Sequence, residues 1–184
     1  MSTGREDRVL GRTLPGDLTI GVITYTFTAM SNDLQAELKQ TRPFPRRTTE
    51  AMLSILRTAA VLDHQLEAAL RPHGLTSTQY NVLRILRGAA GEGLCGREVA
   101  DRMVARVPDV PRLLERLDGM GLIARERDPA DRRHVTARIT RKGLDLLEQV
   151  TPDVDAVEHA RLGHLSGPAL AGLIRELAAI RQGR

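Results

Sequence analysis

Two pairs of arginines are spaced so that their charges can act together. Arg112 and Arg116 are four residues apart, which puts both guanidinium groups on one face of a helix. Arg132 and Arg133 lie in DPADRRHV, residues 128–135, where charged residues around a Pro-Ala pair indicate a turn. Guanidinium groups bind phosphates and guanine edges through paired hydrogen bonds, so both pairs are suited to a polyanion.

The basic excess of the chain is confined to the quarter that contains both pairs. Residues 97–142 hold 12 Arg and Lys against 8 Asp and Glu, whereas the remaining residues hold 15 of each. A confined basic excess favours a nucleic-acid partner. Two other interpretations stay open: Arg112 and Arg116 pair with Asp109 and Glu115, or the 128–135 stretch is only a solvated turn.

No other reactive residues form a recognisable site. Cys95 is the only cysteine, and we interpret it as a small buried side chain rather than a redox sensor. The five histidines lack metal-ligand spacing, and there is no glycine-rich phosphate loop or nucleophile elbow. We therefore expect no enzyme activity, no catalytic residue, no metal and no cofactor.

Length and hydropathy predict one cytoplasmic domain with an added dimerisation region. The chain has 184 residues, 41 % of them hydrophobic, and its apolar runs are shorter than a membrane helix needs. The N-terminus lacks the layout of a signal peptide, so we expect neither export nor membrane contact. Residues 1–29 differ in composition from the rest of the chain. The stretch TLPGDLTIGVITYTFTAM, which ends at Met30, is rich in β-branched residues and nearly free of charge. We expect residues 1–30 to be a disordered N-terminal extension, with Met30 as the hypothetical true start.

Apolar spacing and caps predict the helices. A helical start at Ser31 is broken by the prolines of residues 42–47, and a long helix then runs from Thr48 to the RPHG motif. Thr76 and Gln79 form a capping-box pattern that opens the next helix. Two further helices, near the C-terminus, begin after caps at Thr140 and Ser166.

Between these helices, short elements follow one another in a characteristic order. Residues 96–103 and 108–121 predict two short helices joined by a turn, and LIARERD and VTARIT predict two strands. Helix, turn, helix and β-hairpin together make a winged helix-turn-helix. We predict a recognition helix at about 108–119 in the DNA major groove and a wing over 125–135 in the minor groove.

Three segments resemble MarR-type winged-helix transcriptional regulators: LTSTQYNVLRIL, REVADRM and VPRLLERLDGMGLIARERDPADRRHVTARITRKGLDLL. The resemblance runs from about Thr48 to Ile180 and includes a T-x-x-G-x-x-L pattern at Thr140, Gly143 and Leu146. It implies a homodimer, joined by the first and last helices, that binds pseudo-palindromic double-stranded operator DNA. It also implies repression that a small molecule relieves.

The sequence departs from the family where a Thr or Ser is usual, because residues 108–111 read Pro-Asp-Val-Pro and offer no hydroxyl group there. Arg102 is a further candidate for a phosphate contact. The predicted DNA-binding residues are Arg106, Asp109, Val110, Arg112, Arg116, Arg127, Arg132 and Arg133. We also predict an apolar cleft for a small aromatic or lipophilic ligand, with Arg84 as its polar group. The predicted ligand-binding residues are Leu62, Leu66, Tyr80 and Arg84.

The predicted fold class is mainly α with a small β-hairpin: a winged helix-turn-helix with long N- and C-terminal dimerisation helices. We expect N-terminal dimerisation helices over 31–74, a DNA-binding domain over 75–140 and C-terminal dimerisation helices over 141–184. The alternative function is a winged-helix module for protein or RNA contact without operator binding. Only four aromatic residues are present, so stacking on single-stranded bases has little support.

Overall fold

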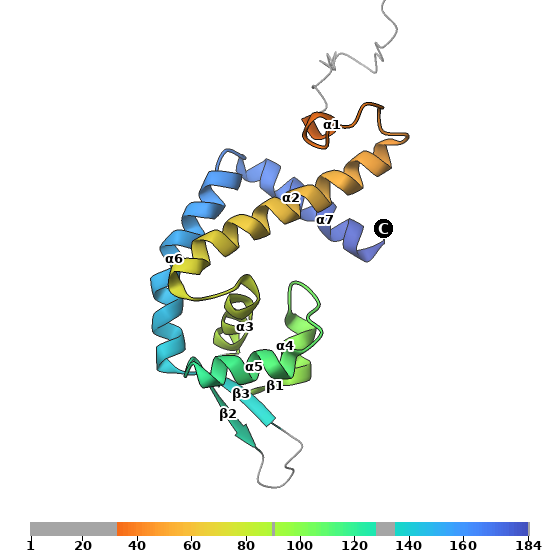
Figure 1. Ribbon diagram of the computed structural model, residues 1–184. Helices are drawn as coiled ribbons and strands as arrows, with labels where there is room; N and C mark the ends of the chain where they lie inside the picture. The colour runs from red at the N-terminus through yellow and green to blue at the C-terminus, as the bar shows by residue number, and fades with distance from the viewer. Residues whose placement is uncertain (1–32, 90, 128–134, 184) are drawn as a thin grey trace, which may run out of the picture. The chain divides into compact units, whose positions relative to one another are not determined.

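The computed structural model describes residues 33–89, 91–127 and 135–183 (Figure 1). The expected extension over 1–30 therefore lies outside the described residues. The chain forms two compact units, Met1–Ser54 and Ile55–Arg184. In the first unit, the described residues form α1, Asp33–Glu37, and the start of α2, Arg47–Leu70. The non-helical residues between α1 and α2 include Pro43 and Pro45, which confirms the predicted interruption.

The start of α3, Ser77–Gly88, is held by its own cap and by α2. The predicted capping box is confirmed: Gln79 N–H donates to Thr76 Oγ1 at 3.2 Å, and Thr76 N–H donates to Gln79 Oε1 at 2.9 Å. A short 3-10 helix, η1 (Arg71–His73), connects α2 to this cap. The N–H of Ser77 also donates to Glu67 Oε1 on α2 at 2.7 Å. The last turns of α2 are therefore fixed to the first turn of α3.

A three-stranded antiparallel sheet in the order β1-β3-β2 follows. The predicted hairpin is confirmed as β2, Ile123–Arg127, and β3, Val135–Ile139. The third strand, β1 (Leu94–Cys95), was not predicted, and it pairs with β3 through Leu94 and Ala137. The fold is thus mainly α, as expected, with one more strand than the hairpin alone.

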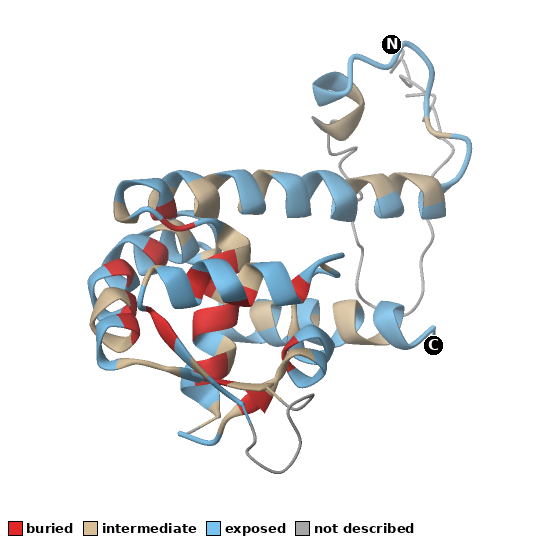
Figure 2. Cartoon of the chain, turned by 60° about the horizontal axis from the view of Figure 1, so that its bottom comes forward, coloured by how far each residue is buried: buried red, intermediate tan, exposed pale blue. Residues whose placement is uncertain are grey.

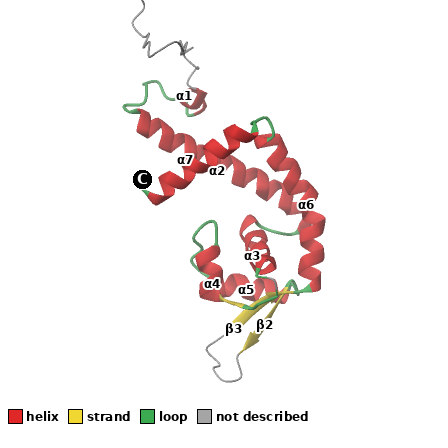
Figure 3. Cartoon of the chain, turned by 180° about the vertical axis from the view of Figure 1, so that it is seen from behind, coloured by secondary structure: helices red, strands yellow, loops and turns green. Residues whose placement is uncertain are grey.

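The core lies between the sheet and three short helices, α3, α4 (Gly96–Arg102) and α5 (Val110–Gly119). Figure 2 shows the buried segments gathered on these elements and on the adjoining part of α6, Arg141–Leu162. The fully buried side chains, which come from α3, α4, α5, β2 and α6 and their connections, include Leu83, Leu86, Val99, Leu117, Ile123, Leu147 and Val150. This packing fixes α5 against β2 (Figure 3).

The last two helices begin at their predicted caps. Gly143 N–H donates to Thr140 Oγ1 at 3.1 Å, and Ala169 N–H donates to Ser166 Oγ at 3.4 Å. The final helix, α7 (Gly167–Gln182), contributes no buried residue to the core. Its Ile174 is 64 % exposed and its Ile180 58 %, so an apolar face of α7 is open to solvent. No helix in the described part of the chain is long and apolar enough to cross a membrane.

Candidate nucleic-acid interface

The first turn of α5 is set by Asp109 and Pro111. Asp109 is the N-cap, and its Oδ1 accepts the backbone N–H of Arg112 at 3.0 Å. Pro111 occupies the first turn, where an N–H would have no partner within the helix. The helix therefore begins at Val110 rather than at residue 108. The carboxylate of Asp109, a predicted DNA-binding residue, accepts a hydrogen bond within the helix cap.

The two sides of α5 differ sharply in burial. Val110, Leu114 and Leu117 are buried in the core. Arg112 and Arg116 are exposed, and helical spacing places them on the opposite side. Val110 was predicted to contact DNA, but its side chain is 5 % exposed and belongs to the core cluster with Leu114.

The acids that flank Arg112 and Arg116 are engaged elsewhere. Asp109 caps the helix, and Glu115 Oε1 lies 3.5 Å from Arg125 Nη1 on β2. Within 33–89, 91–127 and 135–183, neither Arg112 nor Arg116 forms an ion pair. The alternative in which these arginines pair with Asp109 and Glu115 is therefore not what the structure shows. Arg112 and Arg116, with Asp109 and Leu113, line a shallow hollow of about 330 Å³.

The turn before α5 is pinned to α3. Asn81 Oδ1 accepts the backbone N–H of Val104 at 3.0 Å, and sequence analysis did not predict this contact. Val104 itself is 91 % exposed. Arg102, at the end of α4, and Arg106, in the turn, are also exposed. The turn therefore presents basic and apolar side chains beside the start of α5.

The wing begins at the end of β2. Arg127 is the last residue of that strand, is exposed, and is paired in register with Val135. The predicted tip residues Arg132 and Arg133 lie outside the described residues. Strand alternation puts Ile123, Arg125 and Arg127 on one face, buried at the first and exposed at the last. Arg125, half-buried between them, was not among the predicted site residues.

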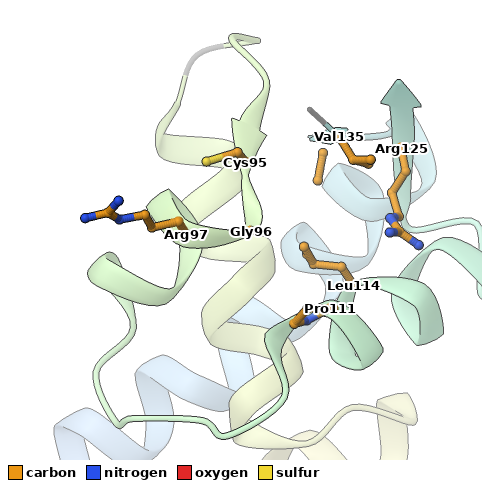
Figure 4. Close-up of a pocket in the computed structure, with 8 residues that line it drawn as sticks. Cys95, Gly96, Arg97, Pro111, Leu114, Arg125 and Val135 are labelled. Carbon is orange, nitrogen blue, oxygen red and sulfur yellow. The ribbon is translucent and has the colours of Figure 1, made fainter. Parts of the chain in front are cut away.

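A cavity of about 440 Å³ lies between α5, the sheet and the start of α4 (Figure 4). Cys95, Leu114, Arg125 and Val135 are among its lining residues. Cys95 is half-buried and is the N-cap of α4, where its N–H donates to Glu98 Oε2 at 2.8 Å. The prediction of a buried filler was therefore only partly correct. No group of three or more His, Cys, Asp or Glu suited to a metal ion occurs in the described segments.

The predicted ligand-binding residues are only partly brought together. The guanidinium carbon of Arg84 lies 5.7 Å from the centroid of the Tyr80 ring, a cation–π distance. Tyr80 is buried, and Leu66 packs against the same core. Leu62 is half-buried on α2.

Fold and charged face together define a winged helix-turn-helix protein. A model of the MarR family matches residues 73–134. The chain is 31 % identical over 113 residues to the transcriptional regulator HosA of Escherichia coli O111:H-, covering 56 % of this chain and 82 % of HosA. The match spans 63 % of the length of MhqR from Bacillus subtilis and 95 % of the length of FarR from Neisseria gonorrhoeae.

Solved structures agree with this assignment. A MarR transcription factor from Planctomyces limnophilus is 37 % identical, with a TM-score of 0.58 over 74 % of this chain and 98 % of that one. CouR from Rhodococcus jostii RHA1, solved with p-coumaroyl-CoA, is 25 % identical, with a TM-score of 0.64 over 74 % and 95 %. The chain belongs to the MarR family; HosA is a transcriptional regulator and the Planctomyces limnophilus protein is a transcription factor.

Proposed function

We propose that the protein is a homodimeric, sequence-specific DNA-binding regulator that represses transcription in the cytoplasm and has no enzyme activity. One observation carries this proposal: α5 directs Arg112 and Arg116 away from the core while both neighbouring acids are engaged elsewhere. Within the described residues Arg112 and Arg116 have no ion-pair partner, and they lie one turn apart on the exposed face of α5. A recognition helix presents such side chains to base edges and phosphates in the major groove.

The rest of the contact surface follows from this placement of α5. With α5 in the major groove, the exposed Arg102 at the end of α4 and Arg106 in the turn before α5 are assigned to phosphates. Arg127 leads into the wing, where Arg132 and Arg133 are assigned to the minor groove and its phosphates. Val110 is omitted because it is buried, and Asp109 is assigned to the helix cap.

A homodimer is supported by apolar surface that the core does not use. Ile174 and Ile180 on α7 are more than half exposed, and on α2 so are Met52 and Leu56. Exposed apolar faces of this kind are typical of an interface between subunits. A two-fold dimer would read a pseudo-palindromic operator, because each recognition helix meets one half-site.

A small aromatic or lipophilic ligand is proposed to release the protein from DNA. CouR, a relative, was solved with p-coumaroyl-CoA. In this chain, the candidate contacts are Leu62, Leu66, Tyr80 and Arg84, where a ligand carboxylate would compete with the Tyr80 ring for the Arg84 guanidinium. A screen of aromatic and lipophilic acids should yield a compound that raises the melting temperature and weakens DNA binding. If none does both, the ligand part of the proposal fails.

Enrichment of duplexes from a randomised library, followed by a salt titration, tests the DNA-binding proposal. We expect an inverted repeat, bound with an affinity that falls steeply with salt because phosphate contacts release counterions. The alternative, a winged-helix module for protein or RNA contact, predicts no enriched duplex motif. A library without a motif and a shallow salt dependence would favour that alternative.

A further inference from the structure

Arg125 connects the recognition helix to the wing sheet. Its guanidinium reaches from β2 to Glu115 on α5, with Nη1 3.5 Å from Glu115 Oε1. The Arg125 side chain is 24 % exposed, whereas that of Glu115 is 63 % exposed. Figure 4 shows Arg125 on the strand beside Leu114 of α5. The ion pair therefore joins a largely buried cation to an acid on the solvent side of the helix.

Stability alone does not account for this arrangement. The Nε of Arg125 is buried and has no hydrogen-bond partner in the described part of the chain. A half-satisfied guanidinium loses much of its hydration, and an apolar side chain of similar shape often stabilises such a position as well or better. The strand partner of Arg125 is Ala137, which is 1 % exposed, so an apolar replacement would adjoin the core. A cation at this position therefore points to a role other than packing.

The position of Glu115 on α5 suggests what that role is. Glu115 follows Arg112 by three residues and precedes Arg116 by one. Residues three apart are neighbours on a helix surface, whereas adjacent residues face different directions. A Glu115 carboxylate without another partner would therefore reach Arg112 before Arg116, and would cancel the charge that the proposed function assigns to DNA.

We propose that Arg125 is a positioning residue for DNA recognition: it draws Glu115 toward the sheet and thereby leaves Arg112 free to contact DNA. This inference rests on the proposed function, because it assigns Arg125 a part in the same interface. Arg125 itself touches no base in this scheme. It acts through Glu115: when Arg125 is removed, the Glu115 carboxylate pairs with Arg112 and weakens the contact of Arg112 with DNA.

A double-mutant comparison separates this role from packing. The probe is the duplex enriched by the wild-type protein, and the variants are Arg125→Met, Glu115→Gln and both together. Arg125→Met should weaken binding by about tenfold or more, the effect of losing one base contact. Adding Glu115→Gln should restore the affinity to within about twofold of Glu115→Gln alone, because no carboxylate then competes for Arg112. Equal weakening in the single and double variants would overturn the proposal, as would full affinity in Arg125→Met.

Arg138→Met is the matched control for charge. Arg138 lies on β3 of the same sheet and pairs with Glu126 at 3.8 Å, so its replacement removes one charge without releasing an acid of α5. It should weaken binding less than Arg125→Met does, and an equal loss would mean that only net charge matters. Arg125→Lys keeps the charge and should rescue most of the affinity. If Arg125→Met does not fold, Arg125→Gln keeps a polar group at this position, and the same outcomes decide.

The NMR signal of the Arg112 Nε–Hε group tests the pairing without DNA. It should report a mobile side chain in the wild type, a restrained one in Arg125→Met, and a mobile one again in the double variant. An unchanged signal in Arg125→Met would overturn the inference. Should the wild type enrich no duplex, the proposed function fails, while this measurement still shows whether Arg125 controls the Glu115–Arg112 pair.

Discussion

Gly143 on α6 packs against the backbone of Leu122, the residue just before β2, without room for a side chain. A Cβ atom at Gly143 would lie 2.2 Å from the Leu122 carbonyl oxygen and 2.8 Å from Cγ1 of Ile139. That oxygen is also held by the N–H of Thr140 at 3.1 Å, and Thr140 Oγ1 donates to the Gly121 carbonyl at 2.8 Å. The Thr-x-x-Gly pattern therefore serves to join α6 closely to the wing sheet.

Gly143→Ala should lower the free energy of unfolding by about 1–3 kcal/mol, the usual cost of forcing extra atoms into a packed site. Denaturant titration of purified protein measures this effect. Gly119→Ala is the matched control, because its Cβ would meet nothing within 4 Å at the end of α5. The control should be neutral or stabilising by up to about 1 kcal/mol, as Ala favours helix more than Gly does. Equal midpoints for the two variants would contradict the close approach described above.

Arg112→Ala should reduce operator affinity and relax base preference at one position of each half-site. If Arg112 reads a guanine edge, its loss costs about 1–3 kcal/mol per half-site. Binding to a panel of duplexes with single base changes measures both effects. Arg87→Ala removes the same charge from α3, outside the proposed contact set, and should change neither preference nor melting temperature. An Arg112→Ala protein with wild-type preference at every position would remove Arg112 from the base-reading residues.

Replacing Arg132 and Arg133 together with alanine should weaken binding almost equally for all duplex sequences, because phosphate contacts carry no base information. If both arginines of each protomer neutralise phosphates, the slope of log K against log salt flattens by about four units, at roughly 0.9 per contact. Arg175→Ala with Arg181→Ala on α7 makes an equal change in charge elsewhere. An unchanged slope in the wing variant would mean that residues 128–135 form only a solvated turn.

Ile174→Glu should convert the proposed homodimer into a monomer. A charge in the centre of an apolar interface loses its hydration without a partner, which costs several kcal/mol. Light scattering coupled to size exclusion measures the mass. Gln182→Glu adds the same charge to α7 on the side away from the stripe of Ile174 and Leu177, and should leave the dimer intact. An Ile174→Glu protein of dimer mass would show that α7 is not at the interface.

Features encoded by short-range spacing were predictable from sequence. The caps at Thr76, Thr140 and Ser166 lie where they were expected, since a cap needs only its own side chain and an N–H three residues on. β1 was missed because two residues cannot show an alternating pattern, and Leu94 becomes a strand residue only through Ala137. Pairing partners distant in the chain cannot be read from a local window.

The candidate site was less predictable than the fold. Val110 lies beside the capping residue of α5 and is buried with Leu114 and Leu117. The i, i+4, i+7 spacing of these three residues was a sequence signal that Val110 faces the core. The pairing of Arg125 with Glu115 needs the angle between strand and helix, which spacing alone does not give. Alternation with Ile123 was the one signal that placed Arg125 on the inner face.

The pairing of β1 with β3 dictates the order in which the chain can complete this sheet during synthesis. Leu94 is paired with Ala137, so β1 must wait until the residues of α4, α5 and β2 have all been made. Local helices form far faster than such distant pairings. On the ribosome, α5 can therefore form before Arg125 has been made and before the sheet is complete. A nascent chain stalled before residue 135 carries α5, the proposed recognition helix, while its supporting sheet is still incomplete.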